Sequence, residues 1–366
     1  MNEDARPTGD GAAPATNAAL PTFEACLAAV SVKDETGKDV MGLAALGRVA
    51  TALQSRCPQL ASTLLSSSVK ASLESYGRQD GEAQRQEDKL KSEAFWSNAS
   101  LLAAGVMSGL ILAVSAGALQ VVGAVDPTTQ SRIVLILGLL TLFLGACAAY
   151  FAYIARDQSR VARWQTCRSE AETARLSAFS TISTKSVVDA AGAPAVAVYG
   201  LAVVVRHLLN DQGAYLARSV QRHRARSETT SRMGALGSAL AFVGGSGAII
   251  ASQTTADAAP WIVWLGVVGA AIGAFAANRE SVSRDRANAE RYDKTLVAMD
   301  AVAGRTDDVA AATGRDPKAL DAFTKTIVDL LSAENQQWLD GTAQANAALD
   351  ALDGRLQQIG KGKTAA

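Results

Sequence analysis

The chain has 366 residues, enough for two or more units of ordinary domain size, and its formal charge is balanced, with 35 basic and 35 acidic side chains. This balance gives no support to a nucleic-acid partner recruited by bulk charge. Aromatic residues make up only 5% of the chain, and no run alternates apolar with polar residues, so we expect an all-α protein without β-structure.

The N-terminal quarter divides into a leader and a helical region. Residues 1–22 mix Pro, Gly, Ala, Thr and Asn, which predicts a disordered leader, and they show no pattern of a cleavable signal peptide. Residues 23–94 follow as predicted cytosolic helices, with apolar positions at helical spacing over Gly42–Arg56 and Gln59–Trp96.

Four charge-free apolar segments dominate the rest of the chain. They are Phe95–Val125, Ile133–Ala155, Met233–Ala256 and Ala258–Asn278. Each is at least about 20 residues long, the length that an α-helix needs to cross a hydrocarbon core of roughly 30 Å. Because the connectors within each pair are short, the paired helices must be antiparallel. The sequence therefore predicts an integral membrane protein with four spans, arranged as two helical hairpins over residues 95–155 and 233–278.

The regions after the two hairpins, residues 156–232 and 279–366, are predicted to be cytosolic helices. They repeat one another at a constant offset of 123 residues. The matching pairs are Arg156 and Arg279, Arg163 and Arg286, Arg168 and Arg291, Glu170 and Asp293, Pro194 and Pro317, Val205 and Val328, Leu208 and Leu331, Tyr215 and Trp338, and Leu216 and Leu339. This register predicts that one unit, a hairpin with its cytosolic helices, was duplicated.

The segment Ala190–Val205 is ambiguous. It carries no charge for 16 residues, but it is short for a membrane span and is closed by Asp189 and Arg206. A buried core helix of the cytosolic bundle is the favoured interpretation, and an interfacial or re-entrant segment is the alternative.

Basic residues near the ends of the spans predict the orientation. The tip of the first hairpin carries only Arg132 and the tip of the second carries none, whereas arginines crowd the regions behind both hairpins. Since cytoplasmic flanks collect Lys and Arg, we expect both tips outside and both termini in the cytoplasm.

No catalytic or metal site is evident. His207 and His223 have basic or apolar neighbours and no paired ligand at metal spacing, so we expect both on helix surfaces. The cluster Gly244, Gly245 and Gly247 lies in the middle of a span with no lysine after it, unlike a phosphate-binding loop. The four cysteines are scattered. We expect a protein that is not an enzyme and that has no metal or other cofactor.

Small residues recur at intervals of four within the spans. The positions are Gly105, Gly109, Gly237, Ala241, Gly245, Gly269 and Gly273. Such spacing lets helix backbones approach closely in lipid, either inside one chain or between subunits. The third span, rich in Gly, Ala and Ser, is expected to pack against protein rather than lipid.

The helix after the first hairpin carries Trp164, Arg168, Ala171 and Glu172. In these residues the chain resembles SLATT-type proteins, a bacterial family with two transmembrane helices, in which a charged helix, a hairpin and a helix with Trp, Arg and Ala-Glu follow one another. Around the second hairpin Ala287 stands in place of the Trp, although Arg291 remains. The resemblance implies a place in the bacterial inner membrane and a pore-forming role in nucleotide-signalled defence.

Two functional hypotheses follow. The first is an oligomeric helical membrane protein, a channel-like or membrane-perturbing effector, whose partners are the lipid bilayer and further copies of itself. The alternative is a non-enzymatic membrane scaffold or anchor whose cytosolic helices bind a protein partner. A secondary transporter is disfavoured, because no ionisable residue lies within a span.

Overall fold

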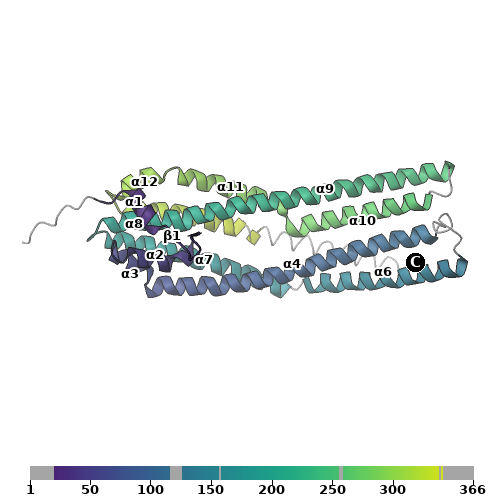
Figure 1. Cartoon of the computed structure of the whole chain (residues 1–366), viewed down its shortest axis with the longest axis horizontal. Coiled ribbons are helices and arrows are strands. Elements are labelled where there is room, and N and C mark those ends of the chain that lie inside the picture. The colour runs from purple at the N-terminus through teal and green to yellow at the C-terminus, as the bar shows by residue number, and fades with distance from the viewer. Residues whose placement is uncertain (1–19, 116–125, 156–157, 255–258, 338, 341–366) are drawn as a thin grey trace, which may run out of the picture.

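The computed structural model describes residues 20–115, 126–155, 158–254, 259–337 and 339–340. These residues form an elongated and almost entirely helical molecule (Figure 1). The elements in chain order are α1 (Phe23–Val30), β1 (Val32–Lys33), β2 (Asp39–Val40), the 3₁₀ helix η1 (Leu43–Ala45), α2 (Leu46–Leu53), α3 (Pro58–Leu64), α4 (Ser67–Ser115), α6 (Pro127–Ala155), α7 (Gln158–Asp189), α8 (Ala195–Val204), the π-helical segment η2 (Val205–Leu209), α9 (Asn210–Thr254), α10 (Ala259–Ser283), α11 (Asp285–Ala303) and α12 (Thr306–Thr313). A last helix over residues 318–337 is called the C-terminal helix.

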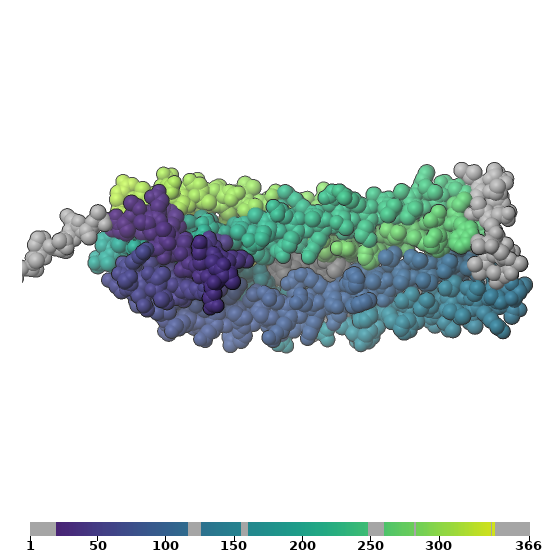
Figure 2. All heavy atoms as spheres, in the orientation of Figure 1, coloured from purple at the N-terminus to yellow at the C-terminus, as the bar shows by residue number. Residues whose placement is uncertain are grey.

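The short helices gather at one end of the molecule, which we call the head (Figure 1). It contains α1, β1, β2, η1, α2, α3, α8, η2 and α12, together with the adjoining parts of α4, α7, α9 and the C-terminal helix. In the space-filling view the purple N-terminal residues of the head lie close to the yellow-green helices near the C-terminus (Figure 2).

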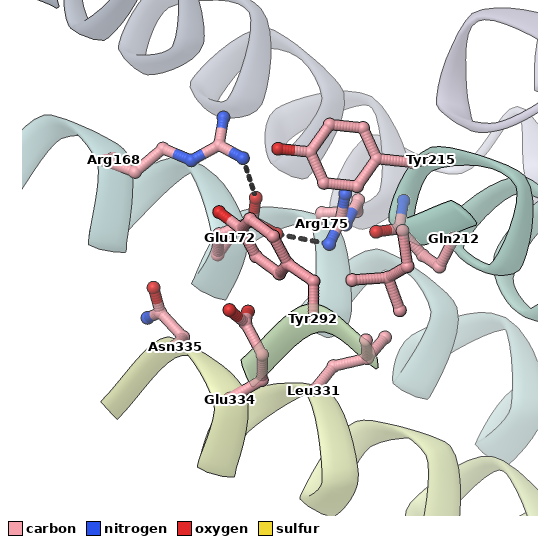
Figure 3. A pocket seen from close by; sticks show the side chains of 10 residues that line it. Arg168, Glu172, Arg175, Gln212, Tyr215, Tyr292, Leu331, Glu334 and Asn335 are labelled. Atoms are coloured by element: carbon pink, nitrogen blue, oxygen red, sulfur yellow. Dashed lines mark ion pairs between the residues drawn. The ribbon is translucent and has the colours of Figure 1, made fainter. Parts of the chain in front are cut away.

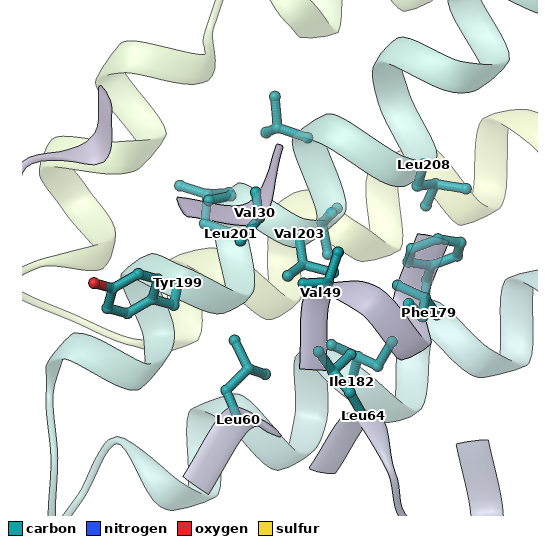
Figure 4. Packing of buried hydrophobic residues seen from close by; sticks show 14 of the residues in the cluster. Val30, Val49, Leu60, Leu64, Phe179, Ile182, Tyr199, Leu201, Val203 and Leu208 are labelled. Carbon is teal, nitrogen blue, oxygen red and sulfur yellow. The ribbon is translucent and has the colours of Figure 1, made fainter. Parts of the chain in front are cut away.

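A single apolar core holds the head together (Figure 4). Its fully buried side chains include Leu46, Leu60, Phe179, Ile182, Leu201, Leu208 and Ile327, which come from six different elements. Burying a large apolar side chain contributes about 1.5–3 kcal/mol, so this core is the main source of the stability of the head.

Local signals in the sequence explain where several head helices begin. The Thr22 hydroxyl caps α1 by accepting a hydrogen bond from the Ala25 N–H at 3.3 Å. Pro58 opens α3 in the first turn, where a missing N–H costs nothing. The helix expected over Gln59–Trp96 is divided at Leu65 and Ser66 into α3 and α4.

A small antiparallel hairpin of strands corrects the expectation of no β-structure. Val32 pairs with Val40, and Lys33 pairs with Asp39. The turn is built by Asp34, whose Oδ1 accepts the backbone N–H groups of Thr36 at 2.9 Å and Lys38 at 3.0 Å. Two-residue strands are too short for an alternating pattern to reveal them in the sequence.

The ambiguous segment Ala190–Val205 lies in the core of the head. Every residue from Val196 to Val205 is buried there, on α8 and the first residue of η2. This placement matches the buried core helix and not the interfacial or re-entrant alternatives. The same run continues through η2 into α9, so the head is connected directly to a long helix.

Two long helices lead away from the head. α4 has 49 residues and α9 has 45, and each runs without interruption to the opposite end of the molecule, where α6 and α10 begin (Figure 1). The two helix pairs point the same way. α6 packs on α4, α4 packs on α10 and α10 packs on α9, so the four helices form a row with α6 and α9 at its edges.

Among the described residues, three helical stretches are long and apolar enough to cross a membrane. They are α4, residues Pro127–Ile154 of α6 and the stretch Pro260–Ala303 that starts in α10. The segment Met233–Ala256 lies on α9, which is not one of the three, and its last two residues fall outside the described residues. Residues 116–125 and Ala258, which were also assigned to spans, lie outside them as well.

The outer face of α6 is apolar and uncovered. Leu135, Ile136, Leu139, Leu142 and Phe143 are each between 59% and 71% exposed. A contiguous apolar face of this kind is unusual on a protein surrounded by water and suits contact with lipid chains.

Candidate functional site

Two features stand out as functional candidates: the glycine seams between the long helices, and a group of buried charges between the head and the hairpins. Of the two glycine seams, the one between α9 and α10 has the shorter distances between the two helix backbones. A Cβ atom added to Gly269 would lie 2.3 Å from the Ala241 nitrogen, and one added to Gly237 would lie 2.5 Å from the Gly273 nitrogen. Real Cβ atoms do not approach backbone atoms this closely, so only glycine permits the packing of α9 on α10 at these positions.

A second seam joins the two hairpins through α4 and α10. A Cβ atom on Gly105 would lie 2.8 Å from the Ala271 Cβ, and one on Gly109 would lie 3.0 Å from the Val267 Cγ1. Near the head end of this seam the amide of Asn278 donates a hydrogen bond to the Asn98 side chain. A polar pair between apolar helices adds to their association.

The remaining predicted packing positions behave differently. A Cβ atom on Gly245 or on Gly273 would meet nothing within 4 Å, although the Gly273 backbone itself is covered by Gly237. Two seam glycines were missed as packing residues in the sequence, Gly244 and Gly266, where a Cβ on Gly244 would lie 2.1 Å from the Gly266 Cα. Neither lies four residues from one of the predicted positions. The closest approaches thus lie inside one chain.

Between the head and the hairpins, α4, α7, α11 and the C-terminal helix bring together six charged side chains (Figure 3 shows four of them). We call this group the ionic cluster; it consists of Asp80, Arg168, Glu172, Arg175, Arg291 and Glu334. Each side chain is at most 29% exposed. Buried charges of this kind are tolerated only when they are paired.

Arg168 is the centre of the pairing. Its Nη1 lies 3.1 Å from an Asp80 oxygen on α4, and its Nη2 lies 2.9 Å from a Glu172 oxygen one turn further along α7. Arg175 pairs with the other oxygen of Glu172, and Arg291 on α11 lies 3.2 Å from Glu334 on the C-terminal helix. The ion pairs thus join α4 to α7 and α11 to the C-terminal helix, and the Asn335 amide on the C-terminal helix donates a hydrogen bond to the Ser169 hydroxyl on α7 at 3.4 Å.

Polar and aromatic side chains close a small cavity beside the cluster (Figure 3). The cavity has a volume of about 30 Å³ and is lined by Gln212, Tyr215, Tyr292 and Asn335 besides the charged residues. It has room for about one water molecule and not for an organic ligand. The Arg291 guanidinium lies 4.9 Å from the centre of the Tyr292 ring, which favours a positive charge there.

Burial and pairing act in opposite directions on these groups. Burial raises the pKa of the Glu334 carboxyl, and the neighbouring Arg291 only partly opposes this rise. Burial also raises the pKa of the Tyr292 hydroxyl, which keeps it neutral. For Arg168 burial lowers the pKa, but Glu172 and other neighbours outweigh it and the pKa rises, so Arg168 stays charged.

The four residues that carry the family resemblance take different places. Arg168 and Glu172 are members of the ionic cluster, Ala171 is fully buried beside them, and Trp164 is half-buried on α7. Arg291, which matches Arg168 at the offset of 123 residues, pairs within the same cluster. Glu334 was not singled out in the sequence, although it lies at that same offset from Asp211.

His207 corrects another expectation because it is buried, whereas His223 keeps 20% of its side chain exposed. His207 is 1% exposed, and its Nε2 donates a hydrogen bond to the Val30 carbonyl at 3.0 Å; burial lowers its pKa to about 4. His223 on α9 lies 2.6 Å from Asp285, the buried first residue of α11. Burial alone would raise the pKa of Asp285, but the hydrogen bond from His223 lowers it.

The metal-ligating and thiol side chains are scattered over the part of the chain that the structure describes. There, no group of three or more His, Cys, Asp or Glu side chains is placed to hold a metal ion. The four cysteines are free, and three of them are buried. Cys147 lies in α6, where it packs as a small apolar residue.

Comparisons of the chain with protein-family models, with curated proteins and with solved structures found no match.

Proposed function

We propose that this chain is an oligomeric membrane effector, in which the head acts on the bilayer through two membrane-spanning hairpins. The observation that carries the proposal is the continuity of α4 and α9, which pass from the head to the far end of the hairpins as single helices. Long helices without a break transmit movement, whereas a protein that only needs an anchor can use a flexible linker.

In this proposal all four long helices cross the bilayer, including the apolar part of α9 that begins at Met233. The support is its close packing along α10 and its exposed apolar side chains Leu236, Phe242 and Val243, which are 54–75% exposed. α6 and α9 lie at the two edges of the row, so a channel-like path would form between chains rather than inside one. The cytosolic side of the inner membrane is the proposed location of the head, as the arginine distribution favours.

The ionic cluster supplies the connection between the head and the hairpins in this proposal. Its ion pairs join α4 to α7 in the first hairpin unit and α11 to the C-terminal helix in the second, and the hydrogen bond from Asn335 to Ser169 at 3.4 Å links the C-terminal helix to α7. A change in the head that moved the C-terminal helix would therefore act on both hairpins. The resemblance to SLATT-type proteins and the repeat at 123 residues are consistent with such a two-unit effector.

Purified protein in vesicles that contain a trapped dye tests the proposal. We expect the wild-type chain to release dye, and we expect Gly269→Leu to abolish release because the α9–α10 seam has no room for a side chain. Gly273→Leu is the matched control on the same helix, since a Cβ there meets open space. Intact vesicles with a correctly folded wild-type protein would contradict an effector that perturbs the membrane.

The scaffold remains the second candidate, and one observation favours it. The head carries an open groove of about 540 Å³ at the end far from the hairpins, between α1, α8 and α12. The walls of the groove are apolar and consist of Phe23, Val198 and Ala310. Its rim is charged and carries Glu24, Asp307 and Arg315. An apolar centre with a charged rim suits the binding of a protein segment. If the protein is a scaffold, dye release will be absent from the wild type and all variants alike.

A further inference from the structure

We propose that the arginine face of α9 binds the phosphate head groups of anionic lipids; this inference rests on the membrane placement in the proposed function. The face consists of Arg222, Arg226 and Arg232, all exposed on the last turns of α9 before its apolar part begins at Met233. Basic clusters next to the cytoplasmic end of a membrane helix are attracted to anionic lipids.

The charge on this part of α9 is not compensated along the helix. Between Gln212 and Thr254, α9 carries five arginines and a single carboxylate, Glu228. Glu228 forms an exposed ion pair with Arg232 at 2.5 Å. Because water screens this pair, a lipid phosphate can take the place of the Glu228 carboxylate beside Arg232. Among the described residues, Arg222 and Arg226 form no ion pair; Arg222 only donates a hydrogen bond to Ser219 at 3.0 Å.

The arginine face continues directly into the face that would contact lipid chains. With about 100° per residue, Arg222, Arg226 and Arg232 fall on the same side of α9 as the exposed Leu236 and Val243, within roughly 120° of one another. Arg232 lies directly before the apolar part of α9. With a rise of about 1.5 Å per residue, Arg226 lies about 10 Å from that part. Both positions are within the head-group layer or within the reach of an arginine side chain from it.

The first hairpin differs at the same boundary. Its approach on α4, from Arg85 to Glu93, has three basic and three acidic residues. Exposed aromatic rings take the boundary position instead: Phe95 and Trp96 on α4, and Tyr150 and Tyr153 on α6. A hydrogen bond from Ser97 to the Ala148 carbonyl at 3.1 Å places the two aromatic pairs at one level. At this boundary the first hairpin therefore presents aromatic side chains on α4 and α6, and the second presents arginines on α9.

The test measures which lipid lies next to the protein. Full-length protein is reconstituted in phosphatidylcholine bilayers with a trace of spin-labelled phosphatidylglycerol or spin-labelled phosphatidylcholine, and the immobilised fraction of each is recorded by electron paramagnetic resonance. We expect an approximately two- to fivefold preference for phosphatidylglycerol in the wild type. The variant R222Q/R226Q/R232Q should lose the preference, while K33Q/K38Q/K70Q, which removes three exposed charges from the head, should keep it.

The outcomes separate this inference from the proposed function. Equal immobilisation of both lipids by the wild type, or equal losses in the two triple variants, would overturn the lipid site. If neither lipid is immobilised, the chain is not in the bilayer, and the lipid site and the membrane placement fall together. A preserved phosphatidylglycerol preference without dye release would uphold the lipid site and count against the effector.

Discussion

Arg168 is the residue on which the ionic cluster depends most directly, since it is the only one of the six paired with carboxylates on two different helices. Replacing it by Gln would leave Asp80 and part of Glu172 without a cation, and both carboxylates are largely buried. Removing one partner of a buried pair costs about 3–5 kcal/mol, and because Arg168 is 29% exposed we expect about 2–3 kcal/mol here. Thermal unfolding in detergent, followed by circular dichroism, measures the loss.

Arg163→Gln is the matched control for Arg168→Gln. Arg163 lies on the same helix and pairs with Glu82 on α4, but it is 65% exposed, so water screens the interaction. We expect a negligible change in its unfolding midpoint. If both variants lower the unfolding midpoint equally, the buried ion pairs of the cluster contribute no more to stability than the exposed pair of Arg163 does.

His207 gives the head a defined dependence on pH. Its pKa is lowered by burial from 6.5 to about 4, so the folded head holds the neutral form while the unfolded chain takes up a proton below pH 6.5. The contribution to stability is complete above pH 6.5 and is lost as the pH falls from 6.5 towards 4. The difference corresponds to about 3 kcal/mol.

The variant His207→Asn isolates this contribution, because its amide can still donate to the Val30 carbonyl but does not titrate. We expect the unfolding midpoint of the wild type to fall more steeply between pH 6.5 and 4 than that of the variant. Parallel curves for the two proteins would show that His207 is not held neutral in the head.

At the scale of elements, α9 is the most informative helix, because it starts in the core of the head and ends at the far end of the second hairpin. Ser227 lies about two turns before its apolar part. A proline there removes one backbone hydrogen bond and clashes with the preceding turn, at a cost of about 3 kcal/mol in a helix interior. We expect Ser227→Pro to change dye release strongly and to lower the unfolding midpoint by several degrees, and Ser227→Ala to do neither. Unchanged release in Ser227→Pro would mean that an unbroken α9 is not needed.

The elements were predictable to different degrees. Long apolar runs predicted α6 and α10 well, because helix length and hydropathy are local properties of the sequence. The break between α3 and α4, the π-helical segment and the short strands depend on tertiary packing and on turn chemistry of a few residues, which a single sequence signals weakly.

The candidate site shows the same limit. The spacing of four pointed to Gly237 and Gly269 but also to Gly245 and Gly273, because the rule does not tell which face of a helix meets its neighbour. Arg168 and Arg291 were noticed through the resemblance and the repeat, yet their convergence with Asp80 and Glu334 joins residues up to 254 positions apart in the chain. A local sequence pattern does not predict a contact between residues so far apart in the chain. The prediction of a surface position for His207 was wrong for a similar reason, because its hydrogen-bond partner, the Val30 carbonyl on α1, is 177 positions away in the sequence.

On the scale of the whole molecule, the two hairpins start from one head and run side by side in the same direction (Figures 1 and 2). A membrane placement that suits one hairpin therefore suits the other, with both tips on the side opposite to the head. Together with the continuity of α4 and α9, this shared direction would let one movement of the head reach both hairpins at once.

Accessibility of single cysteines in intact cells tests this claim most directly. In a chain whose four native cysteines are replaced, one cysteine is placed at Thr128 near the tip of the first hairpin, at Thr254 near the tip of the second, or at Ser227 on the head side. If both hairpin tips lie outside the cell, an impermeant thiol reagent added outside will label the first two and leave Ser227→Cys unlabelled until the cells are opened. Labelling of Ser227→Cys in intact cells, or labelling of only one of the two tips, would contradict it.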